Sequence, residues 1–202
     1  MPSSDSTEGR GDPIGGPSDE ELIRRARQGN RHAFSLLVER YEDRVAATII
    51  GMLGPGADAE DAGQETFVRL YERLDQFRGE SSLGTYLTRI AINQALQVLR
   101  KRKRWTRRFR SREAHADELP HPTGDARDDL EREERKQLTY CTLQELSEAH
   151  RSVVVLRLLQ GYSTKETAEI LNIPEGTVMS RLYRASNQLA ERLAPLLAPD
   201  TP

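Results

Sequence analysis

The spacing of its apolar residues constrains this chain more than any other feature. Between residues 19 and 195, apolar side chains recur at three- and four-residue steps, for example at Phe34, Leu37 and Tyr41. This is the period of a helix with one buried face, and no segment requires the two-residue alternation of a half-buried strand. Aromatic residues make up only 5% of the chain, whereas strands are rich in aromatic and β-branched residues. The sequence therefore predicts an all-α fold.

Breaks in this pattern divide the chain into two small helical domains joined by a flexible linker. The residues at the start are rich in Ser, Gly, Pro and Asp and contain little to bury, so they are not expected to fold. A later stretch contains Pro120, Pro122 and Gly124 and has no sustained helical period. We expect a disordered N-terminal tail (1–18), a first domain (19–104), the linker (105–128), a second domain (129–195) and a C-terminal tail (196–202).

Capping and turn residues mark the expected helix boundaries. Ser18 is followed by three acidic residues and is expected to cap the first helix, and Ser82 is expected to cap a later one. Gly29 and the glycines around Pro55 separate the first helices. In the second domain the helical spacing divides near Ser147.

The residues offer no catalytic or metal-binding centre. A single cysteine, Cys141, excludes an internal disulfide or a multi-cysteine zinc site. The one Glu-x-x-His sequence, from Glu118 to His121, contains Pro120 and cannot place two ligands on one helix face. Phosphate-binding loops and the Gly-x-Ser-x-Gly nucleophile motif are also missing. We therefore expect no metal, no cofactor, no small-molecule substrate and no enzymatic activity.

The sequence also indicates where the protein works. No stretch approaches the ~20 apolar residues that span a bilayer. The first residues lack the basic and apolar regions of a signal peptide. A cytoplasmic location is expected.

Residues 164–183 have the spacing of a helix-turn-helix DNA-binding motif. Counted from Thr164, the motif needs a small residue at the fifth position, a residue tolerant of positive φ at the ninth and an apolar one at the fifteenth. Ala168, Asn172 and Val178 occupy these positions. The alternative is an ordinary helical hairpin at the end of a bundle. In a DNA-binding motif, the second helix would offer these residues to the major groove: Glu175, Thr177, Met179, Ser180, Tyr183 and Arg184.

A strongly basic segment spans the end of the first domain and the start of the linker. Between Arg100 and Arg112, nine of thirteen residues are Lys or Arg and none is acidic, although the formal net charge of the whole chain is only −2. Such a density of cations favours a phosphate partner. Trp105 and Phe109 supply surfaces on which unpaired bases stack. A merely solvated face and a nuclear-targeting sequence are the alternatives.

Three segments, in this order and spacing, resemble a bacterial σ70-family initiation factor of the extracytoplasmic-function (group 4) class. They are DAEDAGQETF (58–67), FRGESSLGTYLTRIAIN (77–93) and GTVMSRLYRA (176–185). With the helices around them they cover nearly all of residues 19–195. The resemblance implies a region 2-like and a region 4-like domain. It also implies a sigma factor, which binds core RNA polymerase, recognises the −35 and −10 promoter elements and aids promoter melting.

The resemblance also implies roles for single residues. Docking on the clamp helices of the polymerase β′ subunit would use Asp58, Asp61, Gln64, Glu65 and Phe67. A loop at residues 76–82 would capture an extruded base of the −10 element, with further contacts along the next helix: Arg78, Ser81, Ser82, Tyr86, Arg89, Asn93, Gln97, Arg100, Lys101, Lys103 and Arg104. Reading of the −35 element would use Thr164, Lys165, Glu175, Thr177, Met179, Ser180, Arg181, Tyr183 and Arg184.

The chain departs from the family's usual residues at several of these positions. Tyr86 stands where Trp is usual, Gln97 where Asp is frequent, and Met179 where a basic residue is frequent. Asn172 stands for the usual Gly. Both residues accept a left-handed conformation, so this last change costs little.

The implied partners are the β′ and β subunits of core RNA polymerase, promoter DNA and an anti-sigma factor. An alternative regulatory mechanism is self-inhibition, in which the acidic remainder of the chain folds back on the basic segment through the linker. The acids concerned are Asp117, Glu118, Asp125, Asp128 and Asp129.

Two other functions remain open at this point. A helix-turn-helix regulator that does not bind core polymerase would need a receiver or ligand-binding domain with strands ahead of the motif, and the sequence shows none. A structural adaptor would need neither the basic segment nor a DNA-reading helix. Binding to core polymerase separates the three functions.

Overall fold

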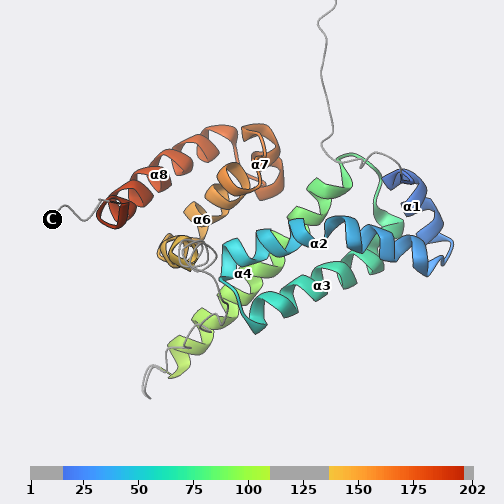
Figure 1. The fold of residues 1–202 in the computed structure, drawn as a ribbon, viewed down its shortest axis with the longest axis horizontal. Coiled ribbons are helices and arrows are strands. Elements are labelled where there is room, and N and C mark those ends of the chain that lie inside the picture. The colour runs from blue at the N-terminus through green and yellow to red at the C-terminus, as the bar shows by residue number, and fades with distance from the viewer. Residues whose placement is uncertain (1–15, 110–136, 198–202) are drawn as a thin grey trace, which may run out of the picture.

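The computed structural model describes residues 16–109 and 137–197, which fold into helices and connecting turns with no strand among them (Figure 1). A helical stretch at residues 137–144 precedes α6. The other helices, in chain order, are α1 (Asp19–Arg27), α2 (Arg31–Leu53), α3 (Ala57–Arg73), the 3-10 turn η1 (Leu74–Gln76), α4 (Leu83–Phe109), α6 (Glu148–Val154), the π-helical turn η2 (Val155–Leu159), α7 (Thr164–Leu171) and α8 (Glu175–Leu197). The predicted all-α fold is confirmed.

The expected capping residues begin the helices. The Ser18 hydroxyl accepts a hydrogen bond from the Glu21 amide (3.3 Å), and the Ser82 hydroxyl accepts one from the Thr85 amide (3.1 Å). Gly54 ends α2 with a φ of 78°, a left-handed value that glycine adopts without strain. The Ser147 hydroxyl accepts from the His150 amide and begins α6. These side chains satisfy amides that the helices themselves leave unpaired.

Helices α2, α3 and α4 form the core of the first part of the chain. Leu37 and Ile49 from α2, Leu70 from α3 and Leu87 from α4 are fully buried against one another. Burying a side chain of this size stabilises the fold by about 1.5–3 kcal/mol relative to leaving it in water. The core therefore fixes the faces that α3 and α4 turn toward solvent.

Helix α4 is longer than the sequence suggested. It continues to Phe109, five residues beyond Arg104, so the first residues assigned to the linker are helical. No glycine or proline stands between Trp105 and Phe109 to stop the helix, and the Thr106 hydroxyl donates to the carbonyl of Arg102 one turn back (3.0 Å). The tail at 1–15, the rest of the expected linker with its acidic residues, and 198–202 lie outside the described residues.

The second part of the chain is a smaller helical unit. Leu143 and Leu146 pack against Val154 of α6 and Ala185 of α8. A second cluster joins Val153 to α7 and α8, and the side chain of Val178 is fully buried there. Figure 1 shows α6, α7 and α8 beside one another at the end of the bundle away from α1.

The two parts share one hydrophobic core. Val155 and Leu156 of η2, with Ile170 of α7, belong to the same buried cluster as the residues of α2 and α4. The fit is close at Gly51 of α2, where an added Cβ atom would come within 2.9 Å of a methyl group of Val155. This glycine therefore lets η2 approach the backbone of α2.

Polar contacts cross the same boundary. The hydroxyls of Tyr162 and Thr88 of α4 are hydrogen-bonded at 2.7 Å, although these residues are only 8% and 1% exposed. Arg151 of α6 is buried and donates to the carbonyl oxygens of Met52 (2.5 Å) and Leu146 (3.0 Å). Burial lowers the pKa of its guanidinium, and the nearby carboxylate of Glu148 opposes that shift. The two parts are thus joined by specific contacts as well as by apolar packing.

Candidate functional site

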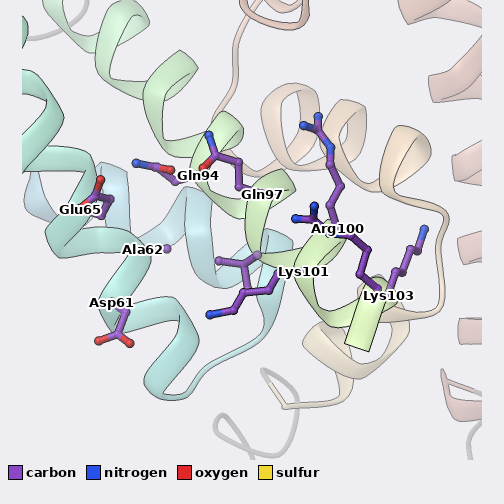
Figure 2. A pocket seen from close by; sticks show the side chains of 10 residues that line it. Asp61, Ala62, Glu65, Gln94, Gln97, Arg100, Lys101 and Lys103 are labelled. Atoms are coloured by element: carbon purple, nitrogen blue, oxygen red, sulfur yellow. The ribbon is translucent and has the colours of Figure 1, made fainter. Parts of the chain in front are cut away.

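A groove with a volume of about 850 Å³ runs between α3 and α4 (Figure 2). Helix α3 contributes carboxylates at Asp61 and Glu65, and α4 contributes a series of cations near its carboxyl end. The residues around the groove are Asp61, Ala62, Glu65, Gln94, Gln97, Val98, Arg100, Lys101, Lys103 and Arg104. The resemblance had assigned the acids to polymerase and the bases to DNA. The fold brings members of both sets to the same groove.

The acidic side of this groove is mostly in solvent. Asp58, Asp61, Gln64 and Glu65 are exposed on α3, whereas Phe67 is half-buried and packs against the core. Asp58 pairs with Arg102 of α4 at 2.6 Å, and Glu65 pairs with Arg69 one turn away at 2.9 Å. Exposed pairs of this kind contribute little to stability, so the carboxylates can exchange these partners for others.

Gln94 lies in the groove and is only 4% exposed. Its side-chain nitrogen has no hydrogen-bond partner among the described residues. Sequence reasoning assigned Gln94 no role, because its importance depends on the packing of α4 against α3. A buried donor without a partner is costly, so it favours an acceptor supplied by a ligand or by water.

The residues proposed for the −10 element lie on the loop before α4 and along α4 itself. Tyr86 is half-buried with its ring centre 5.1 Å from that of Phe77, and the guanidinium of Arg89 lies 5.3 Å above the Tyr86 ring. Arg27 of α1 donates to the carbonyls of Leu74 (2.9 Å) and Phe77, which ties the loop to the bundle. Sequence reasoning missed Arg27 because its partners lie about fifty residues away.

The other members of the −10 set fall into two groups by burial. Ser81 is half-buried at the end of the loop. The exposed members are Arg78, Ser82, Arg89, Asn93, Gln97, Arg100, Lys101, Lys103 and Arg104. Lys103 forms an ion pair at 2.7 Å with Glu148 of α6, so one of the proposed DNA contacts is engaged at the boundary between the two parts.

The helix-turn-helix spacing corresponds to a real motif. Asn172 follows α7 with a φ of 52° and a ψ of 53°, and is the only non-glycine residue with positive φ in the described part of the chain. Ala168 and Val178 are buried where α7 and α8 meet. Ser163 and Glu166 form a reciprocal capping box at the start of α7. The three positions predicted from spacing are confirmed.

The proposed −35 residues lie along the start of α7 and the outer face of α8. Thr164, Thr177 and Arg181 are half-buried. The exposed members are Lys165, Glu175, Met179, Ser180, Tyr183 and Arg184. The polar and apolar groups that a major groove can recognise are therefore accessible on one helix.

Other kinds of site are not visible in the described part of the chain. Among residues 16–109 and 137–197, no group of three or more His, Cys, Asp or Glu side chains is placed to hold a metal ion. Nor does any helix within those ranges have the length and apolar character to cross a membrane. Cys141 is exposed and free.

The fold and this site define a two-part DNA-binding transcription protein, with a charged helical groove in one part and a helix-turn-helix in the other. Residues 37–106 match the family model for sigma-70 region 2, and residues 136–189 match that for sigma-70 region 4. The chain belongs to the sigma-70 family, in its ECF class, and is an ECF sigma factor. Membership excludes the regulator that does not bind core polymerase.

Relatives of known function and known structure agree with this membership. The chain is 35% identical to the ECF RNA polymerase sigma-E factor of Escherichia coli over 188 residues, covering 89% of this chain and 96% of the relative. It is 35% identical to the RNA polymerase sigma-H factor of Pseudomonas aeruginosa over 187 residues, covering 89% and 95%.

Two solved structures also resemble the chain. CnrH in complex with the cytosolic domain of CnrY is 28% identical, with a TM-score of 0.61 and coverage of 86% of this chain and 96% of that one. The sigma factor RpoE of Bartonella quintana, in complex with the anti-sigma factor NepR, is 27% identical, with a TM-score of 0.66 and coverage of 80% and 96%.

Proposed function

We propose that this sigma factor docks on core polymerase through the acidic face of α3 and reads its promoter with α4 and α8. The observation that carries the proposal is the left-handed turn at Asn172, with Val178 buried beneath an exposed, polar face of α8. That arrangement lets a second helix enter a major groove while its inner side remains packed. The first part of the chain would take the core-polymerase and −10 contacts, and the second part the −35 contacts.

The docking role rests on charge and exposure. Asp61 and Glu65 project from α3 at the groove, as Figure 2 shows, and neither is needed for the core of the bundle. A basic partner helix would gain from these exposed carboxylates. The cations of α4 on the opposite side of the groove are then left for the nucleic-acid backbone.

The −10 role rests on the aromatic and cationic surface at the start of α4. A base taken out of the stack needs a flat surface to lie on and a donor beside it. Tyr86 and Phe77 supply rings, and Arg89 supplies a guanidinium over Tyr86. The loop that carries Phe77 is held in place by Arg27, so the surface is organised before DNA arrives.

A proteinaceous inhibitor is a further part of the proposal. The RpoE relative was solved with an anti-sigma factor, and we propose that this chain is likewise controlled by a partner protein that covers its binding surfaces. The protein would work on DNA in the cytoplasm, as a binding factor without a catalytic step of its own.

Core-polymerase binding and run-off transcription test the docking role together. The double change Asp61→Lys and Glu65→Lys should weaken binding to core polymerase at least tenfold, because it places like charges against a basic partner. The matched control is Glu42→Lys with Asp43→Lys, two exposed acids on α2. Equal loss in both variants, or none in either, would contradict the docking role.

A further inference from the structure

An apolar stripe lies on the DNA-facing side of α8. Met179 and Tyr183 are four residues apart, on the same face of the helix, and are 56% and 70% exposed. Val178, which directly precedes Met179 in sequence and faces inward, is fully buried and fixes which side of α8 is outward. Exposed apolar side chains are unexpected on a helix that is proposed to contact DNA, so we ask which apolar group of a partner they could contact.

Met179 is oriented by a neighbour from the first helix of the motif. The Thr164 hydroxyl lies 3.7 Å from the Met179 sulfur, as a weak hydrogen bond to the thioether. This contact ties a long, flexible side chain to the start of α7. The thioether therefore lies beside the amino-terminal end of α7.

Ser180 follows Met179, and its hydroxyl forms a hydrogen bond within α8. The Ser180 hydroxyl donates to the carbonyl of Thr177 at 3.1 Å. Its proton is thereby used inside α8 instead of being offered to a base. Beside it, the thioether of Met179 is exposed and ends in a methyl group.

Only one base presents an apolar group in the major groove, namely thymine with its C5-methyl group. A thioether offers no donor for guanine O6 or N7, in contrast to the basic residue that is frequent at this position in the family. On the basis of the proposed −35 role of α8, we propose that Met179 reads the methyl group of a thymine in the −35 element. Its replacement of a basic residue would then change which base is preferred at that position.

Flanking charge favours DNA over an apolar protein as the occupant of this stripe. Lys165 at the start of α7 and Arg184 beside Tyr183 are both exposed on the same motif. Cations on either side of a small apolar stripe match a groove with phosphates at both edges. A hydrophobic protein partner would leave these cations without counter-charges.

The experiment removes the methyl group and nothing else. Holoenzyme assembled from core polymerase and this protein first selects its preferred −35 sequence from a randomised duplex library. Each thymine of that sequence is then replaced in turn by uracil, which lacks only the C5-methyl group. At one thymine, the replacement should lower affinity about fourfold, which corresponds to the loss of one buried methyl group at about 0.8 kcal/mol.

Variants assign that effect to the side chain. Met179→Ala should bind the thymine and uracil duplexes equally, whereas Met179→Leu should retain the difference. Arg184→Ala is the matched control on the same helix, and should weaken both duplexes while keeping their ratio. Since Met179 is exposed, these changes leave the packing of α8 intact, which circular dichroism verifies.

Each outcome decides a different point. Selection of a defined sequence with no uracil effect at any thymine would overturn the methyl contact while leaving the −35 role in place. The methyl contact would also be overturned if Met179→Ala kept the same difference in affinity between the thymine and uracil duplexes. Weaker binding of Met179→Ala to core polymerase, with the thymine-to-uracil ratio unaltered, would identify the stripe as a protein-docking surface. Failure to select any sequence would refute the −35 role of α8 and the inference with it.

Discussion

The hydrogen bond between Tyr162 and Thr88 gives a sharp measure of how strongly the two parts of the chain hold each other. Tyr162→Phe removes one oxygen and leaves the ring in place. Both hydroxyls are buried, so the variant loses a hydrogen bond of about 0.5–1.5 kcal/mol net and leaves the Thr88 hydroxyl without its cross-domain partner. The carbonyl of Gly84, 3.4 Å from the Tyr162 hydroxyl, also loses a contact. We expect a loss of about 1–2 kcal/mol in the free energy of unfolding.

A double-mutant cycle separates this bond from other effects. Thr88→Val removes the second hydroxyl with nearly the same shape, so the double variant leaves neither hydroxyl of the pair without its partner. The double variant should therefore be less destabilised than the sum of the single variants, by about 1 kcal/mol. Urea unfolding followed by circular dichroism measures all four proteins. Tyr71→Phe is the control, since the Tyr71 hydroxyl is on an exposed side chain and its loss should change stability little. If the destabilisation of the double variant equals the sum of those of the two single variants, the reasoning is refuted.

Three further predictions concern the packing and the motif. Gly51→Ala should destabilise the fold by about 1–3 kcal/mol in urea unfolding, because its Cβ would press on Val155, whereas Gly63→Ala, which meets open space inside α3, should not destabilise. Asn172→Ala should lower stability by about 1 kcal/mol and Asn172→Gly should not, because φ is positive there; equal effects would contradict this. Arg184→Ala should lower promoter affinity by about 1–3 kcal/mol if the side chain contacts a base, or weaken all sequences alike with a smaller salt slope if it contacts phosphate, as titrations at several salt concentrations would reveal.

The helices and the motif were predictable because the signals that specify them are local. A three- to four-residue apolar period, a capping serine or a left-handed asparagine acts within one or two turns of chain, as Ser18 and Asn172 do. The end of α4 was placed too early for the opposite reason. The loss of a sustained apolar period after Arg104 suggested a boundary there, but no glycine or proline from 105 to 109 prevents the helix from continuing.

The features that join distant parts of the chain could not be read from the sequence. Tyr162 and Thr88 are separated by 74 positions, and Arg151 and Met52 by 99, so no periodic pattern links them. The shared groove escaped prediction similarly, because the acids of α3 and the bases of α4 meet only after both helices pack on α2. The roles of these residues in binding still depend on the family resemblance and on the experiments above.

The shared core has a consequence for the reach of the protein along DNA. Elements centred near −35 and −10 lie about 25 base pairs apart, or about 85 Å of duplex at 3.4 Å per pair. Helix α4, at 27 residues and about 1.5 Å per residue, is only about 40 Å long, and α7 packs against it.

With α4 on one element and α8 on the other, the Tyr162 hydroxyl must separate from that of Thr88. Apparent promoter affinity would then be the intrinsic affinity multiplied by the fraction of free protein in which this contact is open. Core polymerase, by holding the two parts at separate docking points, would remove that penalty before DNA is encountered.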